Sequence, residues 1–107
     1  TTMTVKSITS LPELQSLIKS GKAVAIDFFA TWCGPCRMIS PRFESLSEKF
    51  PAITFVKVDV DQAREIATDM QISAMPTFYF FKNGQKVETV VGADPSQLEK
   101  ALAKIAQ

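Results

Sequence analysis

Trp32-Cys33-Gly34-Pro35-Cys36 is the stretch of sequence that decides the fold of this chain. It contains both cysteines and the single tryptophan of the protein. An apolar run, Ala23 to Ala30, precedes it and carries one acidic residue, Asp27, while an amphipathic segment follows it. A buried strand that runs into a helix, with two thiols at the turn between them, is typical of a site for thiol redox chemistry.

The length and composition indicate one globular domain over residues 1–107. A chain of this size buries roughly two-thirds of the surface that its unfolded form exposes, and an apolar content of 46% suits such a core. The net charge is +1 and no two of the twelve basic residues are adjacent. We therefore expect neither a nucleic-acid partner nor a polybasic membrane patch. The apolar runs are far shorter than the roughly 20 residues that cross a bilayer, and no secretory leader is recognisable at the start of the sequence.

The first part of the chain predicts a strand, a helix and a second strand. A short strand is expected from Met3 to Ile8. Residues 10–13, Ser-Leu-Pro-Glu, have the form of a capping box, and Gly21 is expected to end the helix that they begin. Residues 23–30 form the near-continuous apolar run of a central strand that is covered on both faces.

A second helix is predicted after the cysteines, because apolar residues recur there at intervals of four, three and four. Pro41 lies inside this helix and removes one of its N–H groups, so we expect a kink. The apolar residues are Ile39, Phe43, Leu46 and Phe50.

The second half of the chain repeats this order and then changes it. Residues 53–60 predict a strand, and Asp61 is expected to cap the helix that follows it. Asn83-Gly84 is a strong signal for a tight hairpin, so the strands on either side of it should be antiparallel. Asp94-Pro95 is expected to begin a last helix. The four aromatic residues at 78–81 are expected to belong to the core and the sheet.

The sequence resembles the thioredoxin family along nearly its whole length. The resemblance implies an α/β fold with a central five-stranded mixed sheet of order 1-3-2-4-5 and four flanking helices. Phe29 stands where many members carry tryptophan, a difference that concerns packing beneath the site. The motifs that carry the resemblance are Asp27-Phe28, Trp32 to Cys36, Pro41, Val58-Asp59-Val60-Asp61, Ala74-Met75-Pro76-Thr77, Lys82-Asn83-Gly84 and Val91-Gly92-Ala93.

The spacing of the two cysteines suggests different roles for them. If Cys33 caps the helix, its sulfur lies beside unpaired N–H groups at the positive end of the helix dipole, and both favour the thiolate. Cys36 follows three residues later on the same helix face, within reach of Cys33 but more shielded. Pro35 stiffens the turn, and Gly34 and Pro35 together tune the motif. We therefore expect Cys33 to be the nucleophile and Cys36 the resolving thiol.

Other uses of two cysteines fit the sequence less well. A structural disulfide would close a loop of only four residues, which is worth roughly 2 kcal/mol, against about 4.7 for a loop of a hundred. A zinc site needs four ligands, and this chain has two cysteines and no histidine. Attachment of a c-type haem needs histidine at position 37, where the chain has arginine. Buried inert thiols remain an alternative, although the glycine and proline between them favour a turn.

Asp27 is unusual because it lies inside an apolar strand. Burying its charge costs several kcal/mol, so the carboxyl should be partly protonated or paired. The alternative is a carboxylate that reaches solvent at the end of the strand. The family resemblance implies that Asp27 accepts the proton of Cys36, with Lys57 nearby to tune it.

A substrate-binding groove is implied by the same resemblance. Only about 5–6% of X–Pro bonds in folded proteins are cis, but the family pattern implies a cis Pro76 that packs against the disulfide. The residue before it then offers backbone groups to an extended substrate. Gly92 also fits a turn at the end of a strand, and the two interpretations are compatible. The expected groove residues are Trp32, Met75, Pro76, Gly92 and Ala93, together with Gly34 and Pro35 of the motif.

The sequence therefore predicts a protein-disulfide oxidoreductase that acts as a general protein-disulfide reductase. Its four glycines do not compose a dinucleotide or P-loop motif, so no bound cofactor is expected. No metal is expected either, because the chain has only two cysteines and no histidine. The resemblance, which is to eukaryotic cytosolic members, implies a cytoplasmic monomer that receives electrons from NADPH through a thioredoxin reductase. Two alternatives stay open. An oxidase or isomerase would use the same cysteines at a higher potential, although such relatives usually carry histidine where Pro35 stands. A binding module would use the groove alone.

Overall fold

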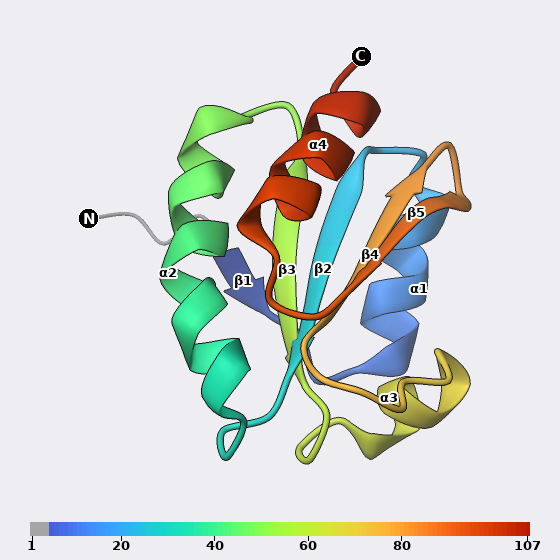
Figure 1. Ribbon diagram of the computed structural model, residues 1–107. Coiled ribbons are helices and arrows are strands. Elements are labelled where there is room, and N and C mark those ends of the chain that lie inside the picture. The colour runs from blue at the N-terminus through green and yellow to red at the C-terminus, as the bar shows by residue number, and fades with distance from the viewer. Residues whose placement is uncertain (1–4) are drawn as a thin grey trace.

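The computed structural model describes residues 5–107 and shows a sheet between two layers of helices (Figure 1). The chain alternates strands and helices in its first two-thirds and then forms a hairpin before the last helix, as the sequence predicts. The elements are β1 (Val5–Ser7), α1 (Leu11–Lys19), β2 (Val24–Phe29), α2 (Gly34–Lys49), β3 (Thr54–Asp59), α3 (Arg64–Asp69), β4 (Thr77–Lys82), β5 (Gln85–Val91) and α4 (Pro95–Ile105).

The sheet has five strands in the order β1-β3-β2-β4-β5. β3 lies parallel to β1 and to β2, whereas β4 is antiparallel to both β2 and β5. This confirms the mixed sheet and the strand order expected from the family resemblance. β2 lies in the middle, and its first five residues are buried, because it is covered on both faces.

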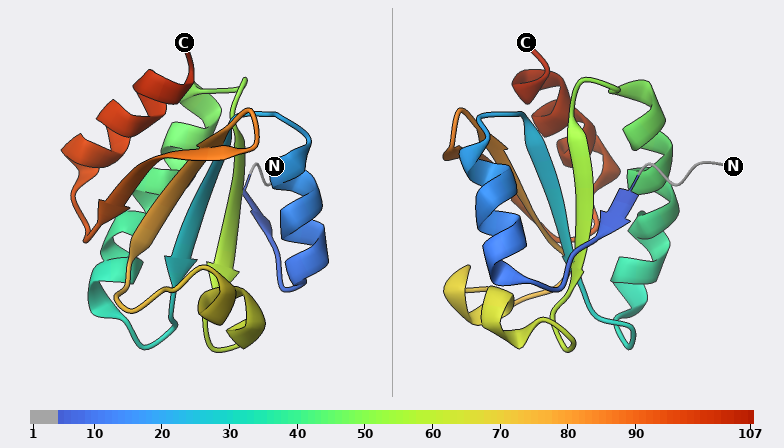
Figure 2. Two further views of the ribbon diagram at one scale, coloured as in Figure 1. Left: turned by 90° about the vertical axis from the view of Figure 1, so that its right-hand side faces the viewer. Right: turned by 180° about the vertical axis from the view of Figure 1, so that it is seen from behind.

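The two faces of the sheet carry different helices. α2 and α4 cover the face that is in front in Figure 1, and α1 and α3 cover the opposite face, which Figure 2 shows from behind. Each layer has its own apolar core. In the α2 layer the centroid of the Phe43 ring lies 5.1 Å from that of Phe55, in an edge-on arrangement, and 5.5 Å from that of Phe78. Aromatic pairs of this kind contribute about 0.5–1.5 kcal/mol beyond the area that they bury.

The helix and turn signals of the sequence are confirmed at three places. The Ser10 hydroxyl oxygen accepts a hydrogen bond from the Glu13 N–H at 3.3 Å and caps α1. Asn83 and Gly84 have φ angles of +57° and +81°, the left-handed pair that a two-residue hairpin turn requires. The Asp94 carboxylate accepts hydrogen bonds from the Ser96 and Gln97 N–H groups and caps α4.

Two sequence predictions need correction or restriction. Asp61 does not cap α3, which begins at Arg64 with Ala63 at the cap position and no side-chain bond to its first turn. The Asp61 carboxylate instead accepts a hydrogen bond from the Trp32 indole. The predicted first strand extends from Met3, but Met3 lies outside the described residues and β1 is seen from Val5. α2 runs through Pro41 from Gly34 to Lys49.

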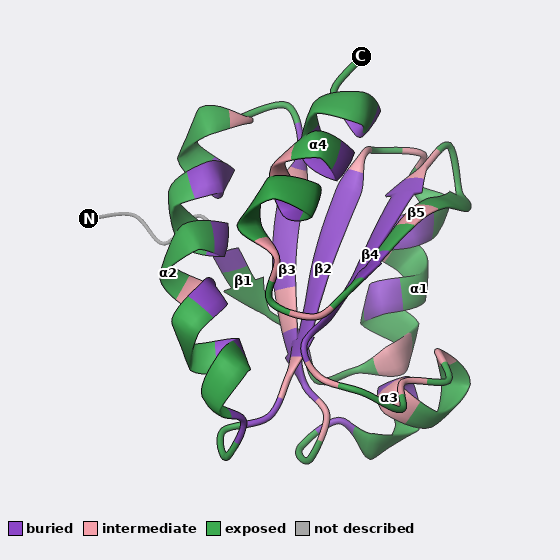
Figure 3. Cartoon of the chain, in the orientation of Figure 1, coloured by how far each residue is buried: buried purple, intermediate pink, exposed green. Residues whose placement is uncertain are grey.

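Burial follows the layers (Figure 3). The strands are buried along most of their length, and the helices expose their outer faces. Within the aromatic run at 78–81, Phe78 and Phe80 are fully buried and Tyr79 and Phe81 are nearly so, which confirms that these rings belong to the core. Among the described residues no helix has the length and apolar character needed to cross a membrane.

Candidate active site

The two cysteines lie where β2 ends and α2 begins (Figure 1). Cys33 occupies the N-cap of α2 with extended backbone angles, φ −86° and ψ 112°, and Gly34 is the first helical residue. The Cys33 sulfur accepts a hydrogen bond from the Cys36 N–H at 3.2 Å and forms a disulfide with the Cys36 sulfur. The Cys33 sulfur therefore occupies the position of a capping oxygen, where N–H groups and the helix dipole stabilise negative charge.

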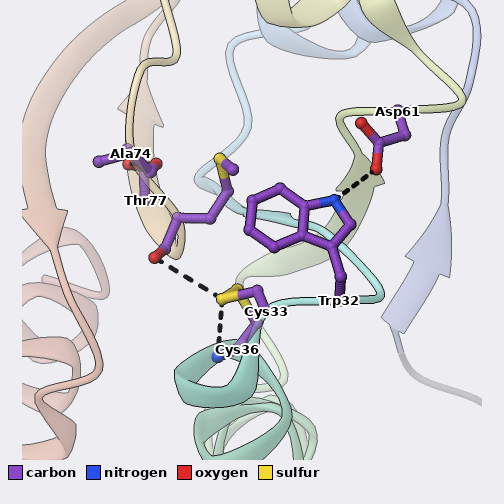
Figure 4. Close-up of a disulfide and its surroundings, with 7 residues drawn as sticks. Trp32, Cys33, Cys36, Asp61, Ala74 and Thr77 are labelled. Carbon is purple, nitrogen blue, oxygen red and sulfur yellow. Dashed lines mark hydrogen bonds between the residues drawn. A yellow bond between two sulfur atoms is a disulfide. The ribbon is translucent and has the colours of Figure 1, made fainter.

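Trp32 stands beside this disulfide and is fixed by a long-range hydrogen bond (Figure 4). Its indole N–H donates to the Asp61 carboxylate at 2.9 Å, although 66% of the residue is exposed. The Asp61 N–H in turn donates to the Asp59 carboxylate at 2.9 Å, so the turn that carries Asp61 is itself held. Sequence reasoning missed this function of Asp61, because a hydrogen bond across 29 residues leaves no trace in local periodicity.

The other side of the disulfide is formed by the loop before β4. The Met75–Pro76 peptide bond is cis. The Met75 carbonyl oxygen lies 3.7 Å from the Cys33 sulfur. The Gly92 N–H donates to the Pro76 carbonyl at 2.9 Å, which brings the loop after β5 against the loop before β4. Gly92 has a φ of +101°, so it also forms the turn that the sequence suggested.

The structure therefore brings several of the predicted groove residues to one edge of the sheet. Met75 is half-buried, Ala93 is exposed and Pro76 is buried. Gly34 and Pro35 are exposed at the start of α2.

Asp27 and Lys57 form the second part of the site. They are direct partners in the parallel pairing of β2 with β3, so their side chains lie on the same face of the sheet, toward α2. Asp27 is 2% exposed, and its Oδ1 atom has no hydrogen-bond partner among residues 5–107. Burial raises the pKa of the Asp27 carboxyl from 3.8 to about 7, and the positive charge of Lys57 opposes part of that rise. The solvent-exposed alternative for this carboxyl does not fit the structure.

A pocket of about 200 Å³ opens behind the first turn of α2. Cys36 and Lys57 both border it, so the second cysteine and the strand partner of Asp27 line one opening. The remaining lining residues are Phe29, Ala30, Thr31, Arg37 and Ser40. Phe29 also packs on the small cluster of Ala30 and the two cysteines, in agreement with the packing role expected of it. Arg37 and Ser40 carry no sequence signal that would have singled them out.

Metal ligands are not assembled here, since the described part of the chain contains no group of three Cys, His, Asp or Glu side chains that could hold an ion. A Cys-x-x-Cys disulfide at the start of a helix, in a chain that alternates strands and helices, is the arrangement of a thiol–disulfide oxidoreductase.

Comparisons with known proteins give the particular family. The thioredoxin family model matches residues 5–104. The chain is 53% identical over 102 residues to a thioredoxin of Coprinus comatus, with 94% of this chain and 96% of that protein covered. It is 48% identical over 98 residues to thioredoxin-1 of Schizosaccharomyces pombe, with coverage of 92% and 95%. The crystal structure of Malassezia sympodialis thioredoxin superposes with a TM-score of 0.93 at 48% identity, over 99% of this chain and 94% of that one.

The chain belongs to the thioredoxin family. It is a protein-disulfide oxidoreductase whose redox-active pair is Cys33 and Cys36. The resemblance stated from the sequence is thereby confirmed.

Proposed function

We propose that this thioredoxin is a general protein-disulfide reductase in which Cys33 attacks and Cys36 resolves. The observation that carries the proposal is the position of the Cys33 sulfur at the N-cap of α2, with the Cys36 N–H directed at it. The Cys33 thiolate attacks one sulfur of a target disulfide and forms a mixed disulfide. The Cys36 thiolate then attacks Cys33, the target leaves as a dithiol, and the Cys33–Cys36 disulfide is formed.

Asp27 is proposed as the base that takes the proton of Cys36 before this second attack. Its folded-state pKa of about 7 allows it to be ionised and still able to accept a proton near neutral pH. Lys57, its partner across the strand pairing, keeps that pKa from rising further. The chain contains no histidine that could serve instead.

The surface around Cys33 is proposed as the docking site for the target. Trp32 forms one wall and is fixed by Asp61, while Met75 and Pro76 form the other beside Gly92 and Ala93. Small residues at this edge let a target backbone come close, and backbone groups of the loop before Pro76 are the candidates for pairing with an extended segment. Gly34 and Pro35 tune the motif by shaping the first turn of the helix.

We propose that the chain acts as a single-domain monomer and carries no bound cofactor. Its electrons would come from NADPH through a thioredoxin reductase, which is the partner that the family resemblance implies. The cytoplasm is the proposed location, since the resemblance is to cytosolic members. A mitochondrial thioredoxin of Saccharomyces cerevisiae is also structurally similar, with a TM-score of 0.89, so cell fractionation is the measurement that decides.

The test is coupled reduction of a disulfide protein such as insulin. The chain is mixed with NADPH, a eukaryotic thioredoxin reductase and insulin, and NADPH oxidation is followed by absorbance. We expect turnover that depends on the chain and is lost when either cysteine is replaced by serine. Insulin reduction with dithiothreitol as the reductant separates a missing reductase partner from a missing reductase activity. If the chain does not accelerate insulin reduction over the rate without it, either with NADPH and the reductase or with dithiothreitol, the proposal is contradicted.

A further inference from the structure

Met38 is the most exposed large apolar side chain in the described part of the chain. It lies in α2, and 80% of the residue is exposed. Trp32 and Val91 are 66% and 62% exposed. Single apolar side chains are common on protein surfaces, but a group of them around one site marks a contact with another molecule. Met38 and Trp32 lie within five residues of Cys33, and Val91 is next to Gly92, so all three are close to the proposed docking site.

Met38 belongs to an uncharged strip on the outer face of α2. This face is exposed in the first turns of the helix (Figure 3). Residues three or four apart on a helix are neighbours, with Cβ atoms about 5–6 Å apart, so Met38 adjoins Gly34 and Pro35 of the motif. Pro41 follows Met38 by three residues, and all four residues are exposed. These four residues, the α2 strip, run from the disulfide along the helix.

Charged side chains border the α2 strip. Arg37 lies about 100° around the helix from Met38, and Arg42 lies one turn further along it. Arg42 donates to the Glu99 carboxylate of α4 at 3.1 Å, so an ion pair closes this end of the strip. An apolar centre inside a polar rim is typical of surfaces that bind other proteins. The α2 strip thus has the composition of a contact surface.

Met38 contributes little to the fold itself. The apolar clusters formed by the described residues do not include it. A methionine side chain is unbranched and polarisable, so it adapts to partners of different shape. A surface that accepts many targets needs a contact of this kind. The exposure and the chemistry of Met38 therefore fit binding to a target better than packing within the chain.

We infer that Met38 is a specificity-determining contact for protein targets and binds an apolar side chain close to the target's cysteine. The inference rests on the proposed function, because the contact forms when a target disulfide reaches Cys33. Met38 takes no part in the exchange between sulfurs, so it acts on binding alone. Loss of an interaction that is equally strong before and during the reaction raises KM and leaves kcat unchanged.

The first experiment measures insulin reduction with dithiothreitol in excess. Met38→Gln keeps the length of the side chain and adds no charge, but makes it polar. We expect KM to rise about fivefold with kcat unchanged, and Met38→Leu to behave like the parent protein. Ser45→Gln is the matched control and should change neither constant, because Ser45 is exposed on the same helix face two turns further from the disulfide. An unchanged KM in Met38→Gln, or an equal rise in Met38→Leu or Ser45→Gln, would overturn the inference.

The second experiment identifies the part of the target that Met38 contacts. Peptides with one cysteine are linked by a disulfide to 2-nitro-5-thiobenzoate, and each carries leucine or serine at one of the three positions on either side of the cysteine. Release of the coloured thiol by the reduced protein gives a second-order rate constant for each peptide. The parent protein should prefer leucine to serine at one position or more. Met38→Gln should lower that preference about fivefold, whereas Met38→Leu should keep it. Equal preferences in Met38→Gln and the parent protein at every position would contradict the contact.

The third experiment separates binding from the reactivity of Cys33. The reduced proteins are alkylated with iodoacetamide between pH 5 and pH 9, and modification of Cys33 is followed by mass spectrometry. Iodoacetamide is too small to need the docking surface, so Met38→Gln and the parent protein should show the same profile. A shifted profile would mean that the substitution acts on the thiolate, against a role in binding alone. A parent protein that does not reduce insulin contradicts the proposed function and this inference with it, whereas an active parent protein with the same KM as Met38→Gln contradicts this inference only.

Discussion

Asp27 is the residue whose surroundings link the pH to the stability of the fold. Its carboxyl has a pKa near 3.8 in the unfolded chain and about 7 in the folded one, because burial disfavours its charge more than Lys57 restores it. The native state therefore keeps this proton to a higher pH than the unfolded chain. The stability from this source is complete below about pH 3.8, declines as the pH rises toward 7 and is absent above it.

Asp27→Asn should remove that decline. The gap between the two pKa values corresponds to a change in unfolding free energy of about 4 kcal/mol, as an upper value for this buried group. We expect the stability of the variant relative to the parent protein to rise by up to that amount between pH 4 and pH 8, as measured by urea unfolding at a series of pH values. Asp69→Asn, at an exposed position of α3, is the matched control and should show no such trend. A pH-independent difference for Asp27→Asn would contradict the assignment.

The same substitution should affect catalysis in the opposite direction. Without the base, Cys36 must lose its proton directly to solvent, so release of the target from the mixed disulfide should slow near neutral pH. The rate should recover as alkali deprotonates the thiol. Rapid-quench measurement of target release between pH 6 and pH 9 checks this. An unchanged pH profile would leave Asp27 without a role in the reaction.

The two cysteines should also separate by substitution. Cys36→Ser keeps the sulfur at the helix cap but removes the resolving thiol, so mixed disulfides with targets should accumulate on Cys33. Cys33→Ser should form none at a comparable rate. Non-reducing electrophoresis followed by peptide mass spectrometry shows which adduct forms. Efficient trapping through Cys36 in the Cys33→Ser variant would reverse the proposed roles.

Among the structural elements, the turn after β5 and the first turn of α2 each begin with a glycine, but for different reasons. Gly92 has a φ of +101°, where an L side chain is strained, whereas Gly34 has an ordinary helical backbone. An added Cβ meets no atom within 4 Å at either position, so backbone conformation alone distinguishes them. Gly92→Ala should therefore destabilise the fold by about 1–3 kcal/mol.

Gly34→Ala is the control for that prediction. Alanine is favoured over glycine in a helix by up to about 1 kcal/mol, so this variant should be as stable as the parent protein or slightly more so. Urea unfolding of both variants provides the measurement. Equal losses of stability in the two would show that φ is not the cause.

The elements that the sequence predicted well are those with local signals. The capping serine of α1, the Asn83-Gly84 hairpin and the buried run of β2 each depend on neighbours within a few residues. The error at Asp61 has the opposite origin. A helix signal follows Asp61, but its carboxylate binds the indole of Trp32, 29 residues away. The residues next to Asp61 in sequence do not reveal whether its carboxylate caps a helix or binds a distant side chain. The pocket lined by Ser40 was missed for the same reason, because its residues come from distant parts of the sequence.

At the scale of the whole molecule, the reduction potential decides between the proposed reductase and an oxidase. The Met75 carbonyl, 42 residues away in sequence, lies beside the Cys33 sulfur, so the potential depends on more than the motif alone. We expect the Cys33–Cys36 pair to have a potential near that of the glutathione pool or lower. Equilibration with glutathione or dithiothreitol buffers, followed by alkylation, gives the value. A potential near −120 mV, as in strongly oxidising catalysts, would contradict the proposed reductase function.

The short span of the disulfide has a consequence for what unfolding experiments measure. The bond joins residues only three apart in sequence, so it restrains the unfolded chain by roughly 2 kcal/mol. The folded and unfolded, oxidised and reduced forms make a closed thermodynamic cycle. The stability that oxidation adds to the fold therefore equals the amount by which folding stabilises the bond, and 2 kcal/mol corresponds to about 40 mV for two electrons. Stabilisation of the Cys33 thiolate by the helix favours the reduced form of the folded protein, so it lowers the stability that oxidation adds. A pair of denaturation curves, one for each redox state, thus reports how much the fold shifts the potential of its own active site.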